Sequence, residues 1–168
     1  LILQDWKQQY PERALPTNAL LKTLLAHNAV DLGNRGPDYQ YGYGSVRALD
    51  TIEFLRSGNH AEDSIRQGEE RYYGVYVAAG TLELKVTVAW DDPPGMPNVI
   101  PELVNDIDIQ AIEPGSNKAH YPWTLEPESP FSSAAQFGPG HINNIEQVCV
   151  TYPQPGMGLL TVVGYSIP

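Results

Sequence analysis

The stretch Leu84–Ile112, "LKVTVAWDDPPGMPNVIPELVNDIDIQAI", decides the fold class of this protein. Apolar and polar residues alternate at both of its ends, and this period of two predicts a half-buried β-strand on each side of a loop. The segment "DDPPG" marks the start of that loop, because Pro and Gly favour turns. Side chains with oxygen atoms that can bind metals gather around the loop: Asp91, Asp92, Glu102, Asn105, Asp106 and Asp108.

The strand pattern continues on both sides of this stretch. The segments "YYGVYVAA", "IEQVCVTY" and "LLTVVGYSI" have the same character, and turn sequences such as "EPGS", "GPG" and "QPG" separate them. Regularly punctuated short strands predict an all-β domain, a β-sandwich or jelly roll, over residues 61–168.

Residues 1–60 have a helical period instead. Leu1–Leu3 has the pattern of the last turns of a helix, and Thr17 is a good N-cap for a second helix over residues 17–28. On that helix, one face would carry Leu21, Leu24, Leu25 and Asn28. A further helix is expected from Ser45 to Arg56, with Gly58 at its C-terminal end. These helices are too few to close a core alone, so their apolar face is expected to dock on the β part or to associate between copies of the chain.

Composition limits the classes of function. The chain has 168 residues, 42% of them hydrophobic, which is enough to bury a core. Residues 59–168 carry 14 acidic and 4 basic side chains, so this half holds the entire net charge of −10. It would repel a phosphate backbone, and we expect no nucleic-acid partner. No run of 18 apolar residues occurs, which predicts no membrane-spanning segment.

Several motifs occur in an order that resembles a known family. The first part contains "LKTLLAHNAVDLG" and "YGYGSVRALDTI", and the second contains "LKVTVAWDDPPG", "LVNDIDIQAIEPG", "HINNIEQVCV" and "PGMGLLTVVGYSIP". Together they resemble the C-terminal part of subtilisin-like serine proteases (subtilases) that carry a β-sandwich after the catalytic domain. More distantly, they resemble the P domains of kexin-type convertases.

The resemblance implies an α+β fold in two parts. Residues 1–60 would be the C-terminal helices of a subtilisin-like α/β catalytic domain, and residues 61–168 a P-domain-like jelly roll or β-sandwich. The parent protein would be a secreted endopeptidase, a hydrolase of peptide bonds. The partners would then be the catalytic domain of the same protein and the peptide or protein substrate of the parent.

Departures from the family pattern bear on catalysis. Arg47 stands where the family usually has Asn, and the "GTS" segment that carries the family nucleophile does not occur. Ser132 and Ser133 lack the glycine spacing of a nucleophile elbow. The chain itself is therefore expected to be inactive and to support the folding and stability of the catalytic domain. The alternative function is a stand-alone β-sandwich module that binds a glycan or a protein.

Two interpretations of the acidic loop stay open. Asp106 and Asp108 are two residues apart and would share one face of a strand. With Asp92, and with Asp91 and Asn105 in support, they could bind a divalent cation, for which hard oxygen ligands favour calcium. Otherwise, these side chains form a solvated rim and accept hydrogen bonds from turn amides. A catalytic carboxylate pair is the least favoured interpretation, since acidic loops are common in sandwiches.

Overall fold

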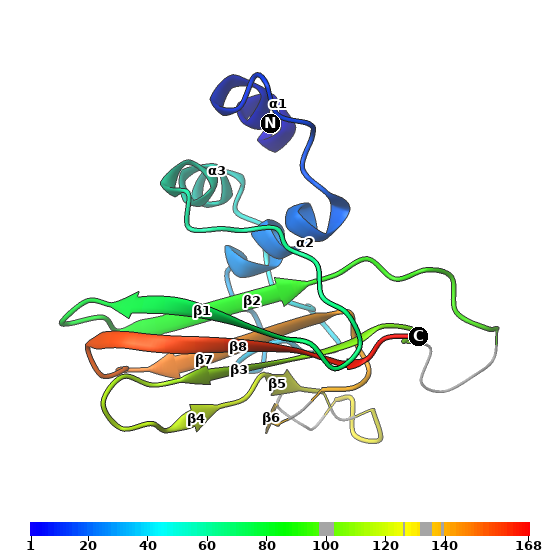
Figure 1. Cartoon of the computed structure of the whole chain (residues 1–168), viewed down its shortest axis with the longest axis vertical. Coiled ribbons are helices and arrows are strands. Elements are labelled where there is room, and N and C mark those ends of the chain that lie inside the picture. The colour runs from blue at the N-terminus through cyan, green and yellow to red at the C-terminus, as the bar shows by residue number, and fades with distance from the viewer. Residues whose placement is uncertain (98–102, 126, 132–135, 139) are drawn as a thin grey trace.

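The computed structural model describes residues 1–97, 103–125, 127–131, 136–138 and 140–168. Three short helices come first and the strands follow, so the chain has a mixed α and β fold with antiparallel sheets (Figure 1). The helices are α1 (Ile2–Gln9), α2 (Asn18–His27) and α3 (Ala48–Ser57). The strands are β1 (Glu70–Val77), β2 (Glu83–Ala89), β3 (Asp106–Ile112), β4 (Ala119–His120), β5 (Trp123–Thr124), β6 (Gln136–Phe137), β7 (Ile145–Thr151) and β8 (Gly156–Ser166).

Capping residues set the start of α2 and the end of α3 as the sequence predicts, whereas α3 begins at Ala48 rather than at the expected Ser45, and no side chain caps its start. The Thr17 hydroxyl accepts a hydrogen bond from the Leu20 N–H at 3.1 Å, which satisfies one of the free amides of the first turn of α2. Gly58 ends α3 in the left-handed conformation, with φ 72°, which costs a glycine little. The prediction for Leu1–Leu3 was wrong in its extent, because α1 begins at Ile2 and continues to Gln9.

The helices share a small apolar core of their own. Trp6, Leu20, Leu24 and Leu55 are buried together in it. On α2 the fully buried residues are thus Leu20 and Leu24, whereas the predicted Leu21 and Leu25 are only half-buried. Burial of an apolar side chain of this size contributes roughly 1.5–3 kcal/mol, so four of them stabilise a helical cluster only modestly.

The β part consists of two sheets that face each other. One sheet has the strand order β1-β8-β3-β4, and the other is the pair β2-β7; both are antiparallel. The core between them is built from β2, β3, β7 and β8, and its buried members include Ile109, Val148 and Val162. Strands β5 and β6 form a further short pair. All five strands predicted from the sequence are present, and β4, β5 and β6 were not predicted.

Strand β8 contains a bulge opposite the start of β3. Asp106 is level with Ser166 while Ile107 is level with Gly164, so Tyr165 is the extra residue on β8. The backbone of Gly164 lies against the segment that precedes β1: its N–H donates to the Glu69 carbonyl, and its carbonyl accepts from Gly68. A bulge changes the direction in which the side chain of its extra residue points, so it determines where the Tyr165 ring lies.

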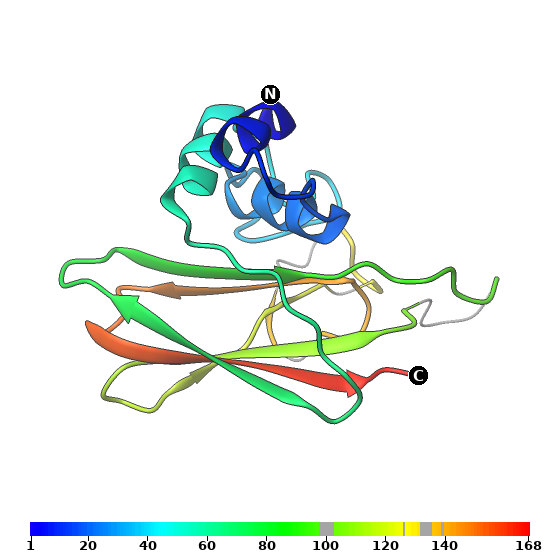
Figure 2. The ribbon, with the colours of Figure 1, turned by 45° about the horizontal axis from the view of Figure 1, so that its top comes forward.

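The helices cover the outer face of the β2-β7 pair, away from the other sheet (Figure 2). This contact includes several hydrogen bonds. His27 Nδ1 lies 3.0 Å from the Thr87 hydroxyl, and Lys22 Nζ donates to the carbonyls of Trp90 and Asn144. The expectation that the helices dock on the β part holds, and these hydrogen bonds contribute to the contact.

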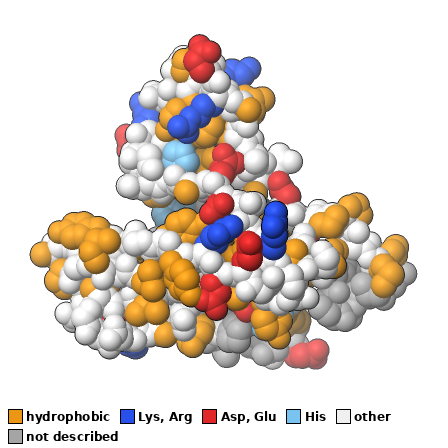
Figure 3. Space-filling view, viewed as in Figure 1, with side chains coloured by type: hydrophobic (Ala, Val, Ile, Leu, Met, Phe, Trp, Pro, Cys, Tyr) orange, Lys and Arg blue, Asp and Glu red, His pale blue; other side chains and the backbone are white. Residues whose placement is uncertain are grey.

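Between Gly58 and Glu70 the chain passes from α3 to β1. On the face shown in Figure 3, acidic and basic side chains gather near the middle of the molecule, where this connection runs. Arg71, at the start of β1, pairs with Asp63 and Glu69 of this connection at 3.7 and 3.3 Å. No helix in the described part of the chain is long and apolar enough to span a membrane.

Candidate functional site

Strand β3 places two of the predicted site residues side by side. Along β3, the buried residues Ile107 and Ile109 alternate with Asp106 and Asp108, whose side chains are 13% and 26% exposed. The alternation keeps the isoleucines in the core and puts both carboxylates on the opposite face, as the two-residue spacing predicts.

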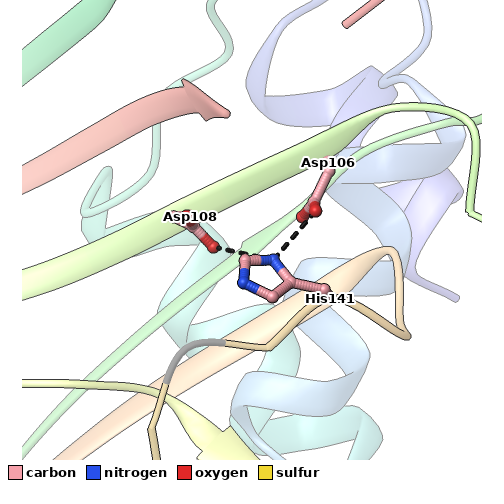
Figure 4. A group of neighbouring side chains, drawn as sticks. All are labelled: Asp106, Asp108 and His141. Carbon is pink, nitrogen blue, oxygen red and sulfur yellow. Dashed lines mark hydrogen bonds and ion pairs between the residues drawn. The ribbon is translucent and has the colours of Figure 1, made fainter. Parts of the chain in front are cut away.

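A histidine from another part of the chain completes the group (Figure 4). His141 lies just before β7, and its Nδ1 atom is 2.8 Å from Asp106 Oδ2 and 3.6 Å from Asp108 Oδ1. One ligand atom from each of Asp106, Asp108 and His141 can be chosen so that all three lie within 4.8 Å of one another. Among the described residues, this is the one group of three or more His, Cys, Asp or Glu side chains with that geometry.

The bulge residue Tyr165 fixes the imidazole from the other side. Its ring stacks on the ring of His141, with centroids 4.7 Å apart and planes inclined by 24°. Since Asp106 is the residue level with the bulge, the same irregularity of β8 positions Tyr165 and the start of the acidic pair.

Both aspartates carry an oxygen that is shielded from solvent and lacks a hydrogen bond. These atoms are Asp106 Oδ1 and Asp108 Oδ1, which have no hydrogen-bond partner among the described residues. Burial raises the pKa of Asp108; the nearby His141 opposes this effect, and Asp106 adds to it. Among the described residues, the carboxylates of Asp106 and Asp108 therefore have fewer hydrogen-bond donors and positive charges around them than they could bind.

A third carboxylate, that of Glu146, lies close to the aspartates but has a different structural role. Glu146 on β7 is only 3% exposed, and its Oε2 accepts the Ile109 N–H at 2.8 Å. It thereby satisfies an amide of β3 on the side away from β8. Burial raises the pKa of Glu146 to about 8; the Ile109 amide works against this shift, while Asp108 and Asp106 contribute to it.

The remaining predicted residues lie outside this group. The carboxylate of Asp92 accepts the N–H groups of Val104 and Asn105, at 3.2 and 2.9 Å, and so ties the two ends of the loop together. The Asn105 carbonyl accepts the indole N–H of Trp90 at 2.7 Å. Asp91 is exposed. Glu102, Ser132 and Ser133 lie outside the described residues.

No local sequence pattern points to His141. Its segment "GHINN" is far from Asp108 in the chain and has no fixed spacing to it. The available signal was indirect: the segment immediately precedes a strand whose buried residues pack in the same core as β3.

A hollow lies between the loop after α2 and the outer face of the β2-β7 pair. Its lining includes Arg35, Lys85, Trp123 and Cys149. Arg35 lies over the ring of Trp123 and donates to the Thr151 hydroxyl at 2.5 Å. The Cys149 thiol is buried, and burial raises its pKa, which disfavours the reactive thiolate.

No protein-family model matches the chain, and no curated protein matches it either. The resemblance to subtilases therefore stays a prediction that depends on the motifs themselves.

Proposed function

We propose that this chain is the C-terminal, non-catalytic region of a secreted subtilisin-like serine endopeptidase. In this proposal the helices complete the catalytic domain, and the β part packs on the outer surface of that domain and stabilises it. The observation that carries the proposal is the docking of α2 on the β2-β7 pair, in which Lys22 Nζ is bonded to the carbonyls of Trp90 and Asn144. A β domain that stabilises a neighbouring domain needs such a fixed contact with it.

Other contacts across the same interface support this role. The Tyr43 hydroxyl donates to the Ile145 carbonyl, and Arg35 donates to Thr151, so the loop between α2 and α3 also holds β7. Burial raises the pKa of the Tyr43 hydroxyl, which keeps this donor protonated. Contacts from α2 and from the loop would transmit the stability of the β part to the helical part.

Exposed apolar residues on the helical part also fit the proposal. Val46, just before α3, and Leu49, in its first turn, are 59% and 65% exposed, and Leu15 is 54% exposed. A catalytic domain of which these helices form the last part would cover such side chains. The same surface could also pair two copies of the chain, as expected from the sequence.

The proposal includes a stabilising cation. Calcium takes oxygen ligands, and Asp106 and Asp108 would supply two of them. The expected supporting ligand Asp92 instead accepts two backbone amides. Calcium would therefore need further oxygens from backbone or water.

The experiment that tests the proposal is to read the coding sequence upstream of Leu1. We expect a "GTSMA" segment preceded by the His and Asp segments of a subtilase. A second arm treats the purified chain with a fluorophosphonate serine probe, and we expect no labelling. An unrelated upstream domain, or stoichiometric labelling of a serine in this chain, would contradict the proposal.

The alternative, a stand-alone module for a glycan or a protein, is favoured by one surface. On β1 the exposed residues Tyr72 and Tyr76 flank Gly74, and Met157 on β8 is level with Tyr76. The two exposed aromatic rings can stack on a sugar ring beside the end of the Met157 side chain, which lies over Gly74. Glycan-array binding that is lost in Tyr76→Ala would favour this module over the protease region.

A further inference from the structure

We infer that Asp106, Asp108 and His141 form a binding site for a divalent transition-metal ion, with Zn²⁺ as the reference ion. This inference does not depend on the proposed function, and at these residues it replaces the calcium of that proposal with a transition metal. It starts from the donor atoms: two carboxylate oxygens and one imidazole nitrogen, contributed by β3 and by the segment before β7.

The spacing of the donors suits a small ion. Ligand atoms about 2.0–2.2 Å from a tetrahedral ion lie roughly 3.3–3.6 Å from one another. His141 Nδ1 is 2.8 Å from Asp106 Oδ2, below that range, and 3.6 Å from Asp108 Oδ1, at its upper end. A side-chain movement of less than about an ångström would bring the shorter distance into the range.

The second observation is the unmet bonding capacity of the aspartates. Asp106 Oδ1 and Asp108 Oδ1 are shielded from solvent and have no hydrogen-bond partner among the described residues. A shielded carboxylate oxygen without a hydrogen bond is costly, and here two such carboxylates lie side by side on one face of β3. A divalent cation would compensate this charge, whereas a protonated His141 alone could supply only one positive charge.

The surroundings hold the histidine in place for such a role. Tyr165 stacks on the imidazole, and the His141 side chain is 41% exposed. The stacking restricts the ring plane, while the exposure leaves room for water to complete the coordination.

The imidazole nitrogen decides the class of metal. Ca²⁺ prefers a shell made of oxygens alone, whereas imidazole together with carboxylates suits Zn²⁺, Co²⁺ and Ni²⁺. For binding, Nδ1 must lack a proton, so the hydrogen between Nδ1 and Asp106 is lost to solvent or moves to Nε2 as the metal enters. No other covalent change is required.

The test uses the full chain, stripped with EDTA and dialysed, in calorimetric titrations with ZnCl₂ and separately with CaCl₂. We expect one Zn²⁺ per chain and weaker binding of Ca²⁺. His141→Gln and Asp108→Asn should each weaken Zn²⁺ binding at least tenfold. His120→Gln is the matched control, since His120 pairs with Glu113 on another part of the sheet and should leave binding unchanged.

Folding is checked separately. Circular dichroism and thermal melting in EDTA establish whether each variant is native, and Asp108→Asn serves if His141→Gln does not fold. Replacing Zn²⁺ by Co²⁺ gives a visible absorption spectrum that should change in the variants. Absence of Zn²⁺ binding would show that the cluster is an ion pair only, and unchanged binding by the folded variants would place the metal elsewhere. Tighter Ca²⁺ binding that does not depend on His141 would also overturn the inference.

Discussion

Lys22 Nζ lies 3.0 Å from the Trp90 carbonyl oxygen and 3.0 Å from the Asn144 carbonyl oxygen. One amine on α2 thus joins the residue that follows β2 to the residue that precedes β7. The same Asn144 carbonyl also accepts the Trp90 N–H at 3.2 Å, so the amine reinforces a place where the two strands already pair.

Replacement of this amine tests the docking of the helices. Lys22→Met keeps most of the apolar stem but leaves the Trp90 carbonyl without this donor. We expect a loss of roughly 1–3 kcal/mol in the free energy of unfolding, measured with urea. Lys7→Met, at an exposed position on α1, should change it by no more than about 0.5 kcal/mol. Equal effects of the two substitutions would mean that the amine contributes nothing specific.

His27 should make the stability of the chain decrease at acidic pH. Burial lowers the pKa of His27 to about 4, and Lys85 contributes to the shift. The unfolded chain then binds the proton more readily, so the contribution of His27 is complete above about pH 6.5 and is lost as the pH falls toward 4. Over the whole shift, about 2.5 pH units at about 1.36 kcal/mol each, the loss should be roughly 3 kcal/mol.

Unfolding free energies of the wild type and of His27→Gln, measured from pH 7.5 to 4.5, check this contribution. Gln can still bond the Thr87 hydroxyl but does not titrate, so the difference between the two proteins should shrink or reverse toward low pH. Parallel curves would show that His27 has the same pKa in both the folded and the unfolded chain.

Thr17 should contribute through its hydroxyl to two parts of the helical region. Its Oγ1 accepts the Leu20 N–H and donates to Glu62 Oε1 at 2.5 Å, which ties the start of α2 to the connection after α3. Thr17→Ala should lower the melting temperature and cost about 0.5–2 kcal/mol. Thr17→Ser keeps the hydroxyl and should recover most of the loss; if it is as damaging as Ala, the cap is not the cause.

Gly164 should tolerate no side chain at the bulge. A Cβ atom there would lie 2.3 Å from the Arg66 carbonyl oxygen, a backbone atom that cannot move away easily. Gly164→Ala should therefore lower the free energy of unfolding by roughly 1–3 kcal/mol. Gly74→Ala is the control, because its Cβ would meet only the flexible end of Met157 at 3.1 Å. Similar melting temperatures for the two variants would contradict this view of the bulge.

The sequence predicted those elements that local chemistry determines. Thr17 marks the start of α2 and Gly58 the end of α3, as expected. The alternation in "DIDIQAI" correctly predicted β3, with a buried face and a less buried face. The extent of α1 was missed because "QDWKQQ" looks polar, yet Trp6 anchors it in the helical core. The two-residue strands β4, β5 and β6 are too short to show a period.

The candidate site could be predicted only in part. The spacing of Asp106 and Asp108 is local, so their common face followed from the sequence. His141 joins them through tertiary packing, and no local pattern encodes that approach. Asp92 looked like a ligand because it lies at the end of a strand, but the amides of Val104 and Asn105 compete for its oxygens.

The position of β8 between β1 and β3 has a consequence for how the chain acquires its structure. The partner of β1 is synthesised last among the strands, so β1 cannot pair until residues 156–166 have left the ribosome. Pairing of such distant segments requires closure of a long loop and makes folding slow. Meanwhile the apolar residues of a nascent, unpaired β1 remain open to mispairing with other chains. We therefore expect the yield of folded protein to depend on chaperones or on dilution more strongly than its final stability would suggest.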